Sequence, residues 1–258
     1  MQWSWWNWSA PQESGILIFK RYEMKTWKRY YFVCTLVLSV QLALAQNGMV
    51  SLGVKGGFNK PQLRGSDVNS SFTSPTSDMF TNFLVGLSAT SQTGKYIWIK
   101  HDIFFAKRYI TTQMTDVVNG NYASQFKRHY IDIYPISPTF HFKGFQLFAG
   151  PYLGILLDAS VQRKNAQGQL YDASIYGNPT QNSGYAQKFD FGYVLGIEYE
   201  FNFGINVGFR YTRGFIPVIE NAASQTQLNI FNDFTSLTLG YTFMGREKSK
   251  KKGMAILH

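Results

Sequence analysis

Apolar and polar residues alternate with a period of two along most of the chain beyond residue 48. The clearest stretch is 189–201, in which the odd positions are apolar and the even positions are mostly small or charged. Side chains of a strand point to opposite faces in turn, so this pattern predicts a β-strand with one apolar face. The same alternation is seen in 205–212 and 236–243 and, less cleanly, in 49–58, 80–90, 96–111, 129–142 and 145–159.

Two prolines, Pro135 and Pro138, interrupt the segment 129–142. The apolar residues change parity across them, with Ile131 and Ile133 on one parity and Phe140 and Phe142 on the other. A β-bulge shifts parity by one residue and tolerates the missing N–H of proline. We therefore expect a bulge near these prolines.

The connections between the eight predicted strands alternate strictly between long and short. The long ones are 59–79, 112–128, 160–188 and 214–233, and the short ones are 91–95, 143–144 and 202–204. In an antiparallel meander this order gathers four long loops at one rim, and three tight turns with both termini at the other. Transmembrane barrels have this layout. The sequence therefore predicts an all-β fold, an eight-stranded antiparallel up-and-down transmembrane β-barrel.

A soluble lipocalin-like barrel also alternates, but with its apolar face inward. Three features favour the apolar face outward. The polar face carries glycine and charges of both signs, which suits a narrow lumen, and the last strand ends in an aromatic residue, as in outer-membrane barrels. Aromatic residues also cluster toward strand ends, as a membrane girdle requires: Tyr193, Tyr199, Phe201, Tyr211, Tyr241 and Phe243.

Residues 24–45 have the pattern of a signal peptide. Three cations in 24–31 precede the uncharged apolar stretch 32–45, which at 14 residues is too short to span a bilayer. The small residues Ala43 and Ala45 predict cleavage that leaves Gln46 first. The one cysteine of the chain, Cys34, lies in this segment, so the mature chain is expected to lack disulfides and thiolate sites.

The other boundaries follow from the signal peptide. Residues 1–23 hold four Trp in their first eight positions, which is compatible with an interfacial anchor. Because a signal peptide normally begins a chain, we interpret 1–23 as a non-native upstream extension and Met24 as the initiator. The barrel then covers 46–243, and 244–258 form a basic C-terminal tail.

Composition excludes two other classes of protein. Charged residues make up 16% of the chain and aromatic residues 17%, and there are 23 Gly. Disordered chains are rich in charge and poor in aromatics, whereas coiled coils are dominated by Ala, Glu, Lys and Leu. Neither description fits.

Several runs resemble a known family. They are Val50–Asn59, Gly150–Tyr152, Asp190–Gly196, Arg210–Phe215 and Leu239–Phe243. In this order and spacing they resemble the PorT-like outer-membrane β-barrel family of Bacteroidetes over roughly residues 49–243. The resemblance implies an eight-stranded outer-membrane barrel and, from the founding member, an accessory role in protein secretion. Such barrels usually end near the terminal aromatic, whereas here 15 residues follow Phe243.

With the polar face inward, charged residues of both signs collect in the lumen: Lys55, Lys100, Asp102, Asp132, Asp190, Glu198, Glu200 and Arg210. Arg108 is expected near one rim, and Asp158 near the other end of its strand. Paired carboxylates could serve catalysis. Since buried charges must be paired, we favour a salt-bridged plug that fills the barrel.

The sequence offers no recognisable catalytic or metal site. Some outer-membrane lipid hydrolases place Ser two residues after His, but the runs here are His101-Asp-Ile, His129-Tyr-Ile and His141-Phe-Lys. Neither G-x-S-x-G nor H-E-x-x-H occurs, and the histidines have no metal-ligand spacing. We therefore expect a non-enzymatic protein without a cofactor.

Two segments remain open to a binding role. The tail 246–252 carries five cations and one acid, and could bind anionic lipid or a periplasmic partner, or be solvated. The loop 160–188 mixes aromatic and basic residues with amides, which suits recognition or, as we prefer, a self-packed cap: Arg163, Lys164, Tyr171, Tyr176, Tyr185 and Lys188.

The expected function is a structural or accessory barrel, and the family resemblance implies a role in protein secretion. Its expected partners are outer-membrane lipid, the outer-membrane insertion machinery and a periplasmic or secretion-system protein, but not nucleic acid. The alternatives are a small solute pore, a soluble lipocalin-like carrier and a lipid-modifying enzyme.

Overall fold

The computed structural model describes residues 50–116, 118–176, 185–220 and 228–244. By its internal contacts the chain divides into two units, 1–47 and 48–258, and every described residue belongs to the second. The predicted signal peptide, its cleavage site Ala43–Gln46, the 1–23 extension and nearly all of the basic tail lie outside the described residues. No helix in the described ranges is both long and apolar enough to cross a membrane.

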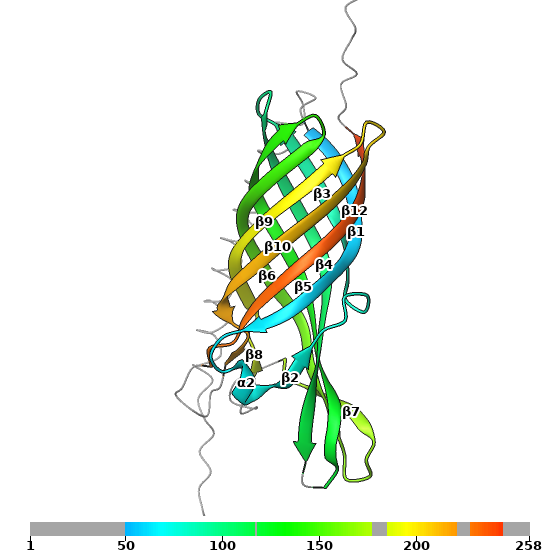
Figure 1. The fold of residues 1–258 in the computed structure, drawn as a ribbon, viewed down its shortest axis with the longest axis vertical. Helices are drawn as coiled ribbons and strands as arrows, with labels where there is room; N and C mark the ends of the chain where they lie inside the picture. The colour runs from blue at the N-terminus through cyan, green and yellow to red at the C-terminus, as the bar shows by residue number, and fades with distance from the viewer. Residues whose placement is uncertain (1–49, 117, 177–184, 221–227, 245–258) are drawn as a thin grey trace, which may run out of the picture. The chain divides into compact units, whose positions relative to one another are not determined.

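Eight antiparallel strands close into a barrel (Figure 1), which confirms the predicted fold class. They are β1 (Val50–Arg64), β3 (Phe83–Gln92), β4 (Ile97–Asp116), β5 (Gly120–Phe142), β6 (Phe145–Lys164), β9 (Phe189–Glu200), β10 (Ile205–Pro217) and β12 (Phe231–Met244). β1 pairs with both β3 and β12, so the first and last strands complete the wall.

The two ends of the barrel differ. The short connections β3–β4, β5–β6 and β9–β10 meet at one end, which we call the turn end and which is at the top of Figure 1. The long connections meet at the loop end and contain five small elements: α2 (Val68–Ser71), β2 (Thr73–Thr76), β7 (Leu170–Ser174), β8 (Tyr185–Ala186) and β11 (Ile219–Glu220). In outer-membrane barrels the turns face the periplasm and the long loops face outward.

The predicted long loop 112–128 is largely strand and 160–188 is strand in part, which corrects the sequence-based bounds. β4 and β5 continue as a hairpin, with Met114 opposite Tyr122, and β7 adds to the edge of β6. Figure 1 shows this part extending beyond the rest of the barrel. We call it the projecting sheet: 111–116, 120–127, 160–164 and 170–174. The sequence signal fades there because the outward residues, such as Thr111, Gln113 and Gln125, are polar.

Two bulges set the direction of side chains. The pairing of β5 shifts register between Ile133 and Thr139, which confirms the bulge expected at the prolines. A second shift lies opposite His129, where Leu157 and Asp158 both face outward. The prediction that Asp158 points into the lumen is therefore wrong, because this bulge reverses its parity.

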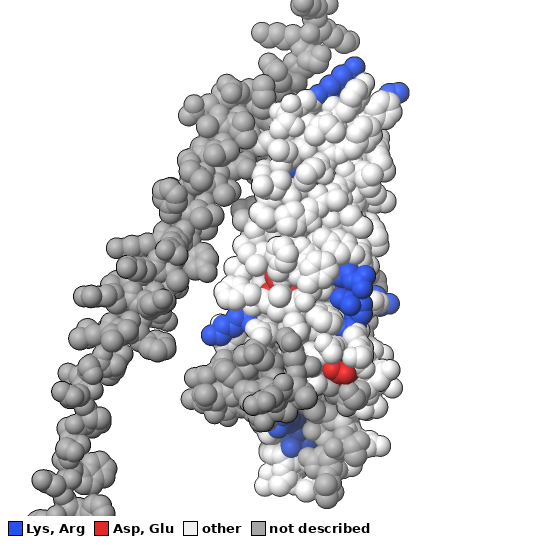
Figure 2. Space-filling view, turned by 90° about the vertical axis from the view of Figure 1, so that its left-hand side faces the viewer, with Lys and Arg blue, Asp and Glu red and all other residues white. Residues whose placement is uncertain are grey.

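The outer face forms an apolar belt. Exposed apolar residues occupy the outward positions of every barrel strand, including Val85, Ile103, Leu147, Leu195 and Leu239. Figure 2 shows a face on which charged groups gather above and below a zone that is almost free of them. Apolar groups therefore face the surroundings and polar groups face the lumen, opposite to a lipocalin-like carrier.

Candidate functional site

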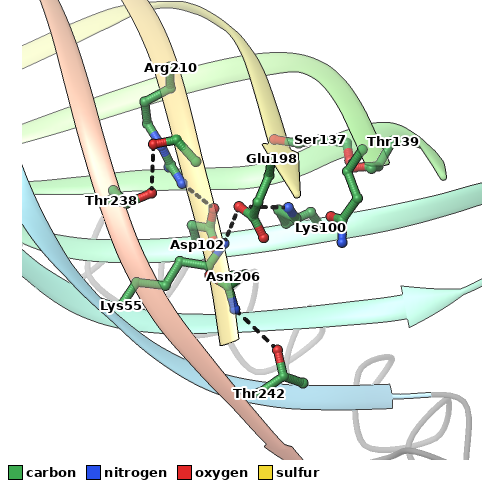
Figure 3. Close-up of polar contacts among 12 residues, drawn as sticks. Lys55, Lys100, Asp102, Ser137, Thr139, Glu198, Asn206, Arg210, Thr238 and Thr242 are labelled. Atoms are coloured by element: carbon green, nitrogen blue, oxygen red, sulfur yellow. Dashed lines mark hydrogen bonds and ion pairs between the residues drawn. The ribbon is translucent and has the colours of Figure 1, made fainter. Parts of the chain in front are cut away.

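Five charged side chains from four strands form one ion-paired network in the lumen (Figure 3). The Nζ atoms of Lys55 and Lys100 lie 2.7 and 3.0 Å from the same oxygen, Oε2 of Glu198. Nη2 of Arg210 lies 3.1 Å from Oδ2 of Asp102, whose Oδ1 is 3.7 Å from Lys55 Nζ. All five side chains are buried.

The network has three cations and two carboxylates, so one positive charge is in excess. Aromatic rings lie next to two of the cations. Nζ of Lys100 lies 4.7 Å from the ring centre of Phe148, and Cζ of Arg210 lies 4.7 Å from that of Phe104. The negative faces of aromatic rings attract cations, most strongly where water is excluded. Rings and carboxylates together therefore compensate the positive charge.

A second cluster lies further toward the loop end. Nη2 of Arg108 lies 2.5 Å from Oδ2 of Asp132, and Nη1 donates to the hydroxyl of Tyr152 at 3.0 Å. That hydroxyl donates in turn to Oδ1 of Asp132 at 3.2 Å. Arg108 is fully buried instead of lying near the rim as predicted, because β4 continues beyond residue 111.

A third cluster contains two residues that the sequence analysis missed. Arg128 donates from Nη1 to Oδ1 of Asn232 at 2.5 Å, and Nδ2 of Asn232 donates to Oδ2 of Asp190 at 3.0 Å. Arg128 and Asn232 were assigned to long loops and so were not considered as lumen residues. The signal available was the alternation continuing backward from Asp132 through Tyr130 to Arg128.

Aromatic side chains fill the lumen between the charged clusters, which the sequence analysis also missed. The buried rings are Phe104, Tyr130, Tyr134, Phe148, Tyr152 and Phe234. Lumen glycines provide their space: a Cβ built on Gly196 would lie 2.3 Å from the Phe148 ring. The sequence signal for this packing was that glycine and aromatic residues, such as Gly196 and Phe148, share the lumen-facing positions of their strands.

An apolar cluster covers the loop end of the lumen. It consists of Val68, Phe72, Phe126, Val218 and Ile230, all buried. The rings of Phe72 and Phe126 stack with their centres 5.7 Å apart. The residues of α2, β5 and the approach to β12 therefore form a lid above the three charged clusters.

At the turn end, by contrast, the lumen is open as a pocket of about 720 Å³. Lys55 and Glu198 of the charged network form part of its lining. Trp98 and His141 stack in its wall with ring centres 3.7 Å apart and planes 9° apart. Lys143 also lines this pocket. It is a polar vestibule that ends at the charged network.

The other predicted site residues lie apart from the network. Glu200 accepts from Nε2 of Gln146 at 3.2 Å at the turn end, and Asp158 lies on the outer face, 3.7 Å from Nδ1 of His129. Four of the six predicted girdle residues are exposed at or next to the ends of their strands, and Tyr193 and Tyr211 are half-buried within theirs. Tyr199, Phe201, Tyr241 and Phe243 are toward the turn end, and Tyr193 and Tyr211 are toward the loop end.

The histidines of the described strands are engaged in other contacts. Nδ1 of His101 contacts the carbonyl oxygen of Pro135, and Nε2 of His129 lies 3.2 Å from the hydroxyl of Tyr109. In the described part of the chain no three His, Cys, Asp or Glu side chains are grouped so that they could hold a metal ion.

Comparisons with known proteins give a family and a set of solved barrels. The outer membrane protein beta-barrel domain matches residues 44–220. No curated protein matches. Among solved structures, Ail of Yersinia pestis is 11% identical, with 75% of this chain and 99% of Ail covered and a TM-score of 0.41. OprG of Pseudomonas aeruginosa is 13% identical, with 75% and 96% covered and a TM-score of 0.42.

The family match covers more than half of the chain and includes β1 to β10. It agrees with the closed wall, the apolar outer face and the filled polar lumen described above. The chain belongs to the family of outer membrane protein beta-barrel domains, and its place is the outer membrane.

Proposed function

We propose that this protein is a non-enzymatic, non-conducting barrel that presents the projecting sheet to a protein partner outside the cell, in the manner of a PorT-like accessory of protein secretion. The observation that carries the proposal is the continuation of β4, β5 and β6 as paired strands beyond the apolar belt. A barrel needed only to span the membrane would end its strands at the rim.

The projecting sheet is held together by contacts of its own. Nζ of Lys127 lies 2.9 Å from each carboxylate oxygen of Asp172, which ties β7 to β5. Val118, Leu170 and Tyr171 expose apolar surface at its far end. A preformed surface loses little conformational freedom on binding, and exposed apolar groups supply the driving force.

The filled lumen supports the non-conducting part of the proposal. Three charged clusters and six buried rings lie between the vestibule and the apolar lid. A small solute pore would require these side chains to move. Purified protein in planar bilayers should therefore show no stepwise conductance, and regular steps would favour the pore instead.

The partner role can be tested by shortening the projecting sheet. Residues 114–122 are replaced with Asn-Gly, a sequence that favours a tight hairpin turn. The variant should still form a closed barrel, whose gel band changes its apparent mass when the sample is heated. Secretion in the native host should be reduced. A matched control, Leu195→Val in the belt, should leave secretion unchanged. Normal secretion by the shortened, correctly folded protein would contradict the proposal.

Export through the signal peptide and delivery to the insertion machinery belong to the same proposal. The predicted cleavage gives Gln46 as the first residue, with β1 beginning four residues later at Val50. N-terminal sequencing of the protein from outer membranes should give Gln46, and a start at or before Met24 would contradict the cleavage.

A further inference from the structure

Outward-facing cations collect at one border of the apolar belt. In β1, β4 and β10 a cation is the next outward residue after the apolar run, on the side of the loop end. The pairs of outward aromatic residue and following cation are Phe58 and Lys60, Phe105 and Lys107, and Tyr211 and Arg213; in β4 and β10 one more aromatic residue, Tyr109 or Phe215, follows the cation.

Strands that run the opposite way have the same arrangement in reverse. Lys127 and His129 precede Ile131 in β5, and Lys188 precedes Phe189 at the start of β9. Between this border and the turns, the outward positions of the described strands carry no Lys, Arg, Asp or Glu. The position of the cations therefore follows the level along the barrel and not the direction of the chain.

Some of these cations form no ion pair with the described residues of the protein, although Asp233 is the cross-strand partner of Arg213. Lys127 is paired with Asp172, and Arg64 donates from Nε to Asp233 at 3.2 Å. Within the described ranges, Lys60 and Lys107 have no carboxylate oxygen within 4.0 Å, and neither does Arg213. The border therefore holds a surplus of positive charge facing the membrane.

Aromatic rings lie on the belt side of two of these cations. Phe83 pairs in register with Phe58, and Lys107 is next to Ala106, the partner of Leu84. Lys60 and Lys107 therefore lie on the two strands that flank the start of β3. Nζ of Lys107 lies 5.9 Å from the ring centre of Phe83 and 4.1 Å from that of Tyr109, the next outward residue toward the loop end.

Further rings extend this apolar surface. Phe80 contacts Phe58 edge to face at 5.5 Å, and Phe105 lies 6.1 Å from Phe83 between ring centres. The surface thus combines two cations with four neighbouring rings, those of Phe58, Phe80, Phe83 and Phe105. It matches an amphiphile with a phosphorylated head.

We propose that Lys60 and Lys107 bind the phosphate groups of lipid A, the phosphorylated glycolipid anchor of lipopolysaccharide in the outer leaflet. The loop end of an outer-membrane barrel faces that leaflet. The rings of Phe58, Phe80 and Phe83 contact its acyl chains. This binding depends on membership of the outer-membrane family and not on the partner of the projecting sheet.

The test measures binding of lipid A to the mature full chain in neutral-lipid nanodiscs. Each cation near an anionic lipid surface contributes to the free energy of binding. The loss of two cations should therefore raise the dissociation constant about 30-fold. The variant K60Q/K107Q is compared with K95Q/K143Q. The control removes the same charge at the turn end, where Lys95 and Lys143 also lie over rings, those of Tyr96 and Phe142.

We expect K60Q/K107Q to lose affinity about 30-fold and the control to stay within about twofold. Both variants should keep the heat-dependent gel shift, which shows that the barrel is closed. Wild-type protein should bind dephosphorylated lipid A at least tenfold more weakly. Equal losses in the two variants, equal binding of dephosphorylated lipid A, or equally tight binding of phosphatidylglycerol would each overturn the assignment.

Discussion

Nζ of Lys55 on β1 lies 2.7 Å from Oε2 of Glu198 on β9, so this pair joins two non-adjacent strands of the wall through the lumen. Lys100 shares the same oxygen. Removing Glu198 would leave three buried cations of the network with Asp102 as their one remaining carboxylate. The pair therefore stabilises the barrel chiefly by preventing uncompensated charge.

Glu198→Gln should lower the free energy of unfolding by about 3–5 kcal/mol, because an unpaired buried charge is more costly than a missing pair. The double variant Lys55→Met/Glu198→Gln should be more stable than Glu198→Gln alone. Urea unfolding in lipid bilayers measures both. If the double variant is the less stable one, the side chains do not act as a compensated network.

Gly196→Ala should destabilise the barrel by about 1–3 kcal/mol, the usual cost of overpacking. Its Cβ would lie 2.3 Å from the ring of Phe148, which is itself held among charged neighbours. Adding Phe148→Leu should recover part of the loss. As a control, Gly56→Ala meets no atom closer than 3.8 Å and should be nearly neutral.

Asp158 and Asp132 test the bulge in β6. Asp158→Asn should change stability by less than about 1 kcal/mol, because its side chain is exposed and its contact with His129 is long. Asp132→Asn should cost several times more, since it removes the charge that Arg108 needs. Thermal unfolding of the two variants under the same conditions decides this, and equal effects would place Asp158 in the lumen.

Single-cysteine labelling tests the vestibule, because the mature chain is expected to contain no cysteine. Thr90→Cys lines the pocket and should react quickly with a membrane-impermeant maleimide in detergent, whereas the buried Ser236→Cys should react slowly. In intact cells, Tyr171→Cys on the projecting sheet should react and Thr90→Cys should not. Labelling of Thr90→Cys in intact cells would mean that the turn end faces outward, which is opposite to the orientation assigned here.

The sequence predicted the strands best where the barrel faces lipid. Leu195 and Ile197 alternate with Gly196 and Glu198 because the two faces meet opposite environments, apolar outside and packed inside. At the loop end the outward residues of β4 and β5 are mostly polar, and the inward ones mix polar side chains such as Ser124 with apolar ones such as Phe126, so the contrast disappears. The ends of these strands were therefore missed.

The site was predicted less completely than the fold. Parity placed Lys55, Asp102 and Glu198 on one face, but alternation carries no information about which strands face one another across the lumen. It also hid Tyr152, an aromatic residue on the polar parity. The stagger of the strands and the bulges determine which side chains meet across the lumen. Both are defined only once the wall is closed.

The pairing of β1 with β12 also determines when the barrel can form. Leu52 to Arg64 are matched with residues between Phe231 and Met244, almost the whole length of the described chain away. The first strand thus has an unsatisfied edge until the last one has been exported. A growing chain cannot complete its wall segment by segment, so it must reach the membrane as an intact, unclosed polypeptide, and a product truncated before Phe231 leaves a seam that no other described strand can fill.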